Sequence, residues 1–298
     1  PFAGGRMRSF HEYDPIAVAL YFLAVTGVAM FFSHPAVTAL TLLGALTYFF
    51  MRNGARDMKA HASLLLLFIV LAAVNPLISH NGRTVLFVLN DSPITLEALL
   101  YGVNSAGMIL GIIYWFRSFT QIMTSDKILC VFGRLSPKLS LVLSIALRFI
   151  PLFRSQAKKV SDAQRAMGMY SDDNIVDNIR GGSRVFSIMV TWALENGIIT
   201  ADSMEARGYG TCRRTSFSPH RMNSGDWLLI AVSAVLSAVS IAGIAAKKLE
   251  FNFYPDIRIS TGGVIGAAAL AAYGVLAFIP VIIEVEAGIK WKYLKSKI

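Results

Sequence analysis

The amino-acid sequence predicts an all-α, polytopic membrane protein with about six transmembrane helices and two long amphipathic helices between the fourth and fifth spans. Of its 298 residues, 55% are hydrophobic and 15% are charged, whereas soluble domains carry about 25% charged residues. The mean hydropathy is +0.56. The apolar residues gather in runs long enough to cross a hydrocarbon layer of about 30 Å. A single soluble globule, a disordered chain and a disulfide scaffold are therefore excluded.

The first apolar stretch is predicted to hold two spans. Residues 15–50 contain no Asp, Glu, Lys or Arg and would form one helix of about 54 Å, which is too long for a single crossing. The segment Ser33-His34-Pro35 supplies the break, because proline disfavours helical geometry in the preceding residue and starts a new helix well. The remaining spans are expected at 62–79, with a kink near Asn75-Pro76, and at 98–116, 227–246 and 259–283.

These runs divide the chain into three parts: 1–116 with four spans, 117–226 without one, and 227–298 with two spans and a basic tail. The middle part carries 15 basic and 9 acidic side chains. If it is cytoplasmic, the remaining loops and tails carry 9 Lys and Arg inside and 4 outside. Because Lys and Arg are enriched in cytoplasmic loops, both termini are expected to be cytoplasmic.

The middle part becomes amphipathic at Pro137. A first helix is expected from there, kinked or divided at Pro151 and ended by the turn-forming residues 171–174. Its apolar stripe follows helical spacing and consists of Phe153, Ala157, Val160, Gln164 and Met167.

A second amphipathic helix is expected to begin near residues 181–183 and to run to Arg207, where Gly208 and Gly210 stop it. Its apolar face consists of Val185, Ile188, Met189, Trp192 and Ile199. The two apolar stripes are expected to be buried against each other, against the membrane surface or against other proteins.

Several segments together carry a family resemblance. They are Thr124-Ser125-Asp126-Lys127, residues 132–138, Leu147-Arg148-Phe149-Ile150-Pro151, residues 201–210 with Glu205-Ala206-Arg207-Gly208-Tyr209-Gly210, Asn75-Pro76, and residues 95–99. The chain resembles, over nearly its whole length, the transmembrane T components of energy-coupling factor (ECF) transporters, the family that includes the cobalt-transport CbiQ proteins.

The resemblance implies a subunit without catalysis of its own. Such T components have coupling helices on the cytoplasmic side, each ending in an Ala-Arg-Gly-like motif that docks into a groove of an ATP-binding cassette subunit. A separate membrane subunit, the S component, captures the substrate, usually a vitamin or a metal ion. The implied partners are two cassette ATPase subunits or one fused ATPase, the S component and the lipid bilayer, in a bacterial or archaeal cell membrane.

By this resemblance, the second docking motif is Ala206-Arg207-Gly208. On local sequence alone, Arg207 is a last-turn arginine that complements the helix dipole, with Gly208 as the cap. The resemblance implies instead that Arg207 binds the groove of the ATPase subunit, because a guanidinium offers a rigid fork of hydrogen-bond donors to acidic residues. Ala206 and Gly208 leave room for close approach.

The first docking motif departs from the family pattern. It consists of Arg165, Ala166, Met167 and Gly168, where the family usually carries arginine in place of Met167. A thioether packs well in an apolar groove but cannot form an ion pair. Either this site binds mainly by packing, which we favour, or Arg165 compensates. The asymmetry suggests two non-identical ATPase sites.

Small residues recur on one face of three predicted spans: Gly107 with Gly111, Gly262 with Gly266, and Ser233, Ala234, Ser237 and Ala238. Such faces let helices approach closely. They serve either internal packing or a surface on which the S component rests.

No catalytic, cofactor or metal site is expected. The five histidines lack metal-ligand spacing, and no Gly-x-x-x-x-Gly-Lys-Ser/Thr loop is present, so ATP hydrolysis is expected in partner subunits. Nucleic acid is not an expected partner, whereas the basic tail suits anionic lipid. The alternative function is a secondary transporter or channel with its own pathway, which generally needs ionisable residues near mid-membrane. The predicted spans contain essentially none.

Overall fold

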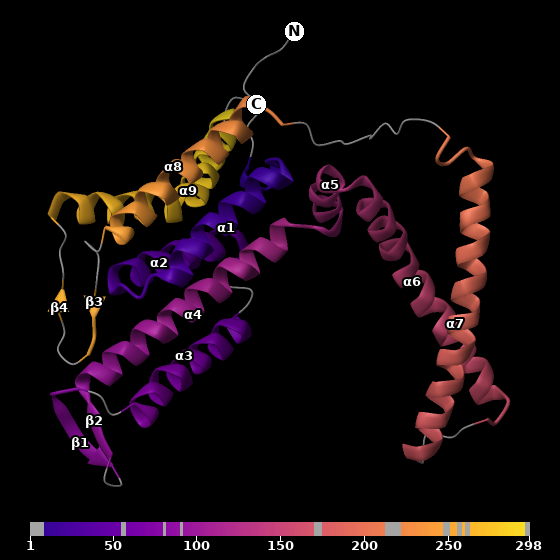
Figure 1. The fold of residues 1–298 in the computed structure, drawn as a ribbon, viewed down its shortest axis with the longest axis horizontal. Coiled ribbons are helices and arrows are strands. Elements are labelled where there is room, and N and C mark those ends of the chain that lie inside the picture. The colour runs from indigo at the N-terminus through magenta and orange to yellow at the C-terminus, as the bar shows by residue number, and fades with distance from the viewer. Residues whose placement is uncertain are drawn as a thin grey trace. The chain divides into compact units, whose positions relative to one another are not determined.

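The computed structural model describes residues 9–54, 58–79, 82–89, 92–169, 175–211, 222–246, 251–254, 258–259 and 263–295. The chain divides into two compact units (Figure 1). The first unit comprises residues 1–128 and 220–298, and the second comprises residues 129–219. The boundary between them falls within helix α5 (Ser125–Leu135).

The first unit is a bundle of apolar helices with two short hairpins. Its elements are η1 (Phe10–Glu12), α1 (Pro15–Phe31), α2 (Pro35–Asn53), α3 (Met58–Ile78), β1 (Val85–Leu89), β2 (Ser92–Thr95), α4 (Leu96–Ile122), α8 (Ser224–Ala245), β3 (Phe251–Asn252), β4 (Arg258–Ile259) and α9 (Gly263–Lys295). Figure 1 shows α3 lying along α4 and α8 lying along α9. Within each of these two pairs, the helices pack against each other.

Six described helices are long and apolar enough to span a membrane. They are α2, residues 60–78 of α3, α4, α6 (Pro137–Ala166), residues 224–243 of α8, and α9. The shorter α1 has 17 residues, which is at the lower end of what a span needs. These six helices differ from the spans predicted from the sequence, because they include α6, which is long and apolar enough to span a membrane. However, the apolar window of α6 contains no buried residue, in contrast to the spans of the first unit.

The break predicted at Ser33-His34-Pro35 is confirmed, since α1 ends at Phe31 and α2 begins at Pro35. The His34 side chain is the N-cap of α2, because its Nδ1 accepts a hydrogen bond from the amide of Ala36 at 3.2 Å. The capping side chain of His34 and the proline that follows it therefore set the boundary between α1 and α2. Pro76 lies inside α3, and the kink expected there stays a prediction.

Two hairpins were not predicted. Strand β1 pairs with β2 in antiparallel register, with Val85 opposite Thr95, and β3 pairs with β4, with Phe251 opposite Ile259. The last span was expected from residue 259, but α9 begins at Gly263. An apolar run beside a span is helical or extended depending on its pairing partner, which sequence periodicity alone does not reveal.

An aromatic cluster fills the core of the first unit. Phe10, Tyr21 and Trp115 are fully buried, and Tyr48 is almost so. The Phe10 ring packs edge-on against Tyr21, at 5.4 Å between centroids, and against Tyr48, at 6.0 Å. The amide of Phe10 also donates to a carboxylate oxygen of Glu284 on α9 at 3.1 Å. The segment that precedes α1 is thereby anchored in the helix bundle.

The small residues of α4 pack internally. A Cβ added to Gly107 would lie 3.1 Å from Cγ2 of Thr38, and one added to Gly111 would lie 3.0 Å from Cγ2 of Thr41. Both contacts are with α2, as the internal-packing interpretation predicts. Gly262 lies outside the described residues. On α8, by contrast, Ala234 and Ser237 line a groove of about 450 Å³ against α1.

The second unit contains α6 and α7 (Ile175–Ala206). Pro151 was expected to kink or divide the first helix. It lies inside α6, which continues to Ala166, so the helix is not divided there. The kink at Pro151 stays a prediction. The second helix was expected to begin near residues 181–183 and instead begins at Ile175. A glycine pair costs a helix only about 2 kcal/mol, at roughly 1 kcal/mol each, and Gly181 is buried in the unit. The first helix was expected to end at residues 171–174, but α6 ends earlier, at Ala166. The predicted turn itself lies outside the described residues.

Candidate docking site

The two amphipathic helices pack through part of the stripes identified in the sequence, whereas Met167, Ile188 and Ile199 are exposed. Phe153 of α6 meets Trp192 of α7 edge-on, with ring centroids 5.2 Å apart. Gln164 and Met189 are also buried. In Figure 1 the helices run antiparallel within the second unit, so their C-terminal ends lie at opposite ends of the pair. Helices of 30 and 32 residues separate these ends by about 45 Å.

The end of α7 is a Schellman cap that contains Ala206, Arg207 and Gly208. Gly208 has a positive φ of 78°, which suits a residue without a side chain. Its amide donates to the carbonyl of Glu205 at 2.8 Å, and the amide of Tyr209 donates to the carbonyl of Met204 at 3.0 Å. This pair of bonds defines the motif. We call residues 204–209 the second tip.

The end of α6 repeats this cap. Gly168 has a φ of 67°, its amide donates to the carbonyl of Arg165 at 2.9 Å, and the amide of Met169 donates to the carbonyl of Gln164 at 3.1 Å. We call residues 164–169 the first tip. Met167 therefore holds the position that Arg207 holds in the second tip. The structure places the predicted residues of each motif at one helix end, and it keeps the two motifs apart.

Both tips present their central residues to the surroundings. Met167 is 63% exposed, and Arg207 is exposed as well. Among the described residues, no hydrogen-bond or ion-pair partner is found for the Arg207 guanidinium. Ala166, Gly168, Ala206 and Gly208 are exposed too, so a partner can reach the backbone at either tip.

A cleft of about 480 Å³ adjoins the second tip. Sequence reasoning assigned no role to Arg148, although it lies in one of the segments that carry the family resemblance. The structure brings Arg148 of α6 and Arg207 of α7 to this one cleft, so its walls carry two positive charges. The lining residues are Leu141, Ser144, Ile145, Arg148, Ile199, Thr200, Ser203, Met204 and Arg207.

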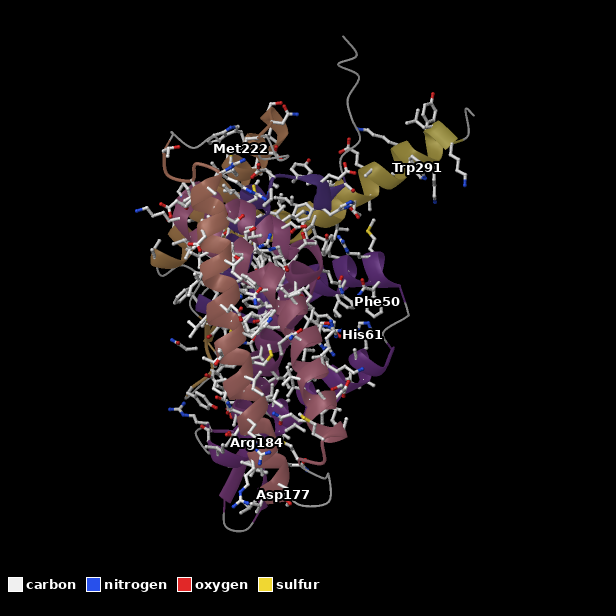
Figure 2. The ribbon with its side chains drawn as sticks, turned by 90° about the vertical axis from the view of Figure 1, so that its right-hand side faces the viewer. Phe50, His61, Asp177, Arg184, Met222 and Trp291 are labelled. Atoms are coloured by element: carbon white, nitrogen blue, oxygen red, sulfur yellow. The ribbon has the colours of Figure 1, made fainter. Side chains whose placement is uncertain are left out.

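The first tip also has an arginine beside it, from the other helix. Arg184 of α7 is exposed, and its Nη1 lies 3.5 Å from the carbonyl oxygen of Met169 and 3.2 Å from the Met169 sulfur. Figure 2 shows Arg184 and Asp177 along the first turns of α7. Sequence reasoning missed Arg184, because only the antiparallel pairing of α6 and α7 brings it to the tip.

The two tips combine charged, apolar and backbone groups of the kind found in protein-binding surfaces. Within the described part of the chain, no three His, Cys, Asp or Glu side chains come together as a metal site would require. The tips offer guanidinium groups, exposed thioethers and close backbone approach. This combination suits a groove that is apolar at its base and acidic at its rim.

Comparison with known proteins identifies the family. The sequence matches the family model described as cobalt transport protein, CbiQ, over residues 7–217. It is 27% identical over 252 residues to the energy-coupling factor transporter transmembrane protein EcfT of Lactococcus lactis, covering 78% of this chain and 92% of that protein.

Two further relatives carry the same name. The EcfT of Staphylococcus aureus is 24% identical over 253 residues, covering 78% of this chain and 94% of that protein. The EcfT 1 of Listeria monocytogenes is 32% identical over 102 residues, and that match spans 34% of this chain and only 38% of the length of that relative.

Proposed function

This chain belongs to the CbiQ family of ECF transporter T components, and from that premise we propose that it is the coupling subunit of an ATP-driven importer. The observation that carries the proposal is the duplicated tip. Two helices in one antiparallel pair end in the same Schellman cap, about 45 Å apart. Two like contact points at that separation suit a partner with two like domains, such as a pair of cassette ATPases.

In this proposal, each tip docks into a groove on one ATPase domain. Arg207 forms a charge-assisted pair with an acidic residue of the groove, and Arg148 in the adjoining cleft adds positive charge. Movement of the ATPase domains during nucleotide hydrolysis then shifts the tips. The long continuous helices α6 and α7 transmit that shift through the chain to the first unit, which we call the membrane unit from here on, because packed helices move as rigid bodies.

The membrane unit delivers the motion to a substrate-binding S component in the bilayer. The open groove between α1 and α8, lined by Ala234 and Ser237, is a surface where a partner helix can approach closely. We place residues 117–226 and both termini on the cytoplasmic side, following the distribution of Lys and Arg. The imported substrate is a vitamin or a metal ion, and it is chosen by the S component.

The test is to purify the chain from native membranes in mild detergent and to identify what accompanies it. Cassette ATPases together with a small hydrophobic membrane protein are expected. Truncating a desolvated charge pair costs about 2 to 5 kcal/mol, so Arg207→Ala should lower ATPase recovery and transport while membrane insertion stays unchanged. Undiminished transport in Arg207→Ala would remove the role of Arg207. Solute movement by the purified chain alone, without ATP, would favour a secondary transporter or channel instead.

A further inference from the structure

The two tips share a backbone but differ in charge. At the second tip the C-cap residue is Arg207, and at the first tip it is Met167. The first tip also exposes Met169, at 49%. It therefore presents two thioethers where the second tip presents a guanidinium and a tyrosine ring.

Arg165 is poorly placed to replace the missing charge. It precedes Met167 by two residues in the same helix, which places it about 200° around the helix axis, on the opposite side. Its N-terminal neighbour Gln164 is buried in the helix pair. A partner that covers Met167 from its exposed side would therefore not meet Arg165.

Arg184 is well placed to supply that charge. It lies 15 residues beyond Met169 in the chain, and its Nη1 touches the Met169 carbonyl oxygen and sulfur at 3.5 and 3.2 Å. Its side chain is exposed, so donors of the guanidinium fork that do not face Met169 remain available. The geometry puts a cation directly past the C-terminal end of α6, beside the exposed methionines.

We propose that Arg184, reaching across from α7, is the docking arginine of the first tip. Its partner is an ATPase domain whose groove has an apolar base for Met167 and Met169 and a carboxylate for the guanidinium. This inference rests on the proposed function, because it assumes that the first tip docks on an ATPase. It also makes the two docking sites chemically different, since one arginine lies on the helix end itself and the other reaches that end from the neighbouring helix.

The experiment uses the complete complex and one cross-linking reporter at each tip. A photo-reactive residue replaces Ala163 in one protein and Ser203 in another; both positions are exposed and lie four residues before Met167 and Arg207. Arg184→Gln keeps a hydrogen-bond donor for the Met169 carbonyl but removes the charge. It should lower the ATPase cross-link from position 163 by about thirtyfold, the smallest effect expected for losing one partner of a desolvated charge pair. The cross-link from position 203 should be unchanged.

Matched variants separate the outcomes. Arg184→Lys keeps the charge and should retain most of the cross-link. Arg154→Gln, on the exposed face of α6, is the control for loss of one positive charge and should have no effect. An unchanged cross-link from position 163 in Arg184→Gln overturns the inference, and an equal loss in Arg184→Lys would reduce Arg184 to a structural contact. If neither position cross-links to an ATPase in the parent protein, the proposed function fails instead.

Discussion

Met167 and Arg207 occupy equivalent positions at two helix ends, each one residue before a glycine with positive φ. The equivalence is geometric, but the side chains offer a partner different chemistry. If the two docking grooves differ accordingly, adding Met167→Arg to Arg207→Ala should not restore transport. Transport in membrane vesicles measures this, with Arg207→Lys as the variant that keeps the charge. Recovery in the double variant would show that the two sites are interchangeable.

Gly208 should be sensitive to any side chain. Its φ of 78° disfavours other residues by about 1 to 2 kcal/mol, and a new Cβ would lie 3.2 Å from Oγ1 of Thr211. Gly208→Ala should therefore distort the second tip and weaken ATPase binding by about tenfold, with little change in the melting temperature of the membrane unit.

The control for Gly208 is Gly197→Ala. Gly197 lies within the same helix, with no atom within 4 Å of the added Cβ. Alanine there should leave ATPase binding unchanged and stabilise the helix slightly. Equal binding by both variants would mean that the tip tolerates a different backbone.

The contact between α3 and α4 depends on Gly102. A Cβ at this position would lie 2.6 Å from the carbonyl oxygen of Ala72 and 3.1 Å from Cβ of Asn75, so the helices must move apart. Gly102→Ala should destabilise the membrane unit by about 1 to 3 kcal/mol, measured as thermal unfolding in detergent. Gly27→Ala is the matched control, because no atom lies within 4 Å of its added Cβ. A melting temperature equal to that of the control would contradict the close packing.

Phe10 should contribute strongly to stability although it precedes the first long helix. The ring is fully buried, whereas Phe31 is 82% exposed. Removing a fully buried aromatic ring costs about 3 to 5 kcal/mol, so Phe10→Ala should lower the unfolding temperature far more than Phe31→Ala does. Similar effects of the two substitutions would show that the segment before α1 is not anchored.

His34 should make stability depend on pH. Burial lowers the pKa of His34 from its usual value of 6.5, and its Nδ1 must be unprotonated to accept from the Ala36 amide. The folded state thus favours the neutral ring, and the unfolded state binds more protons between the lowered pKa and pH 6.5. The contribution of His34 is complete above pH 6.5 and is lost as the pH falls through the lowered pKa.

The measurement for His34 is thermal unfolding between pH 8 and pH 5, compared with His34→Asn. Asparagine keeps an N-cap acceptor without titrating in this range. The parent protein should lose stability relative to the variant on acidification. Parallel curves for the two proteins would exclude His34 as the titrating group.

The sequence by itself determined the features that depend on neighbouring residues. The break at His34-Pro35 and the glycine cap at residue 208 follow from the backbone preferences of one or two residues. The apolar stripes through Phe153 and Trp192 likewise follow from helical periodicity. The number and order of apolar runs settled the class of protein, because a hydrocarbon layer demands long apolar helices.

Only the tertiary structure decided which distant residues meet. The pairing of α6 with α7 brings Arg184 to Met169 and brings Arg148 and Arg207 to one cleft. The core of the first unit likewise joins Phe10 to Glu284, 274 residues apart. Such contacts depend on how whole helix faces fit together, and many pairings satisfy the same periodicity. For the same reason the sequence indicated the two tips but not the arginine beside the first one.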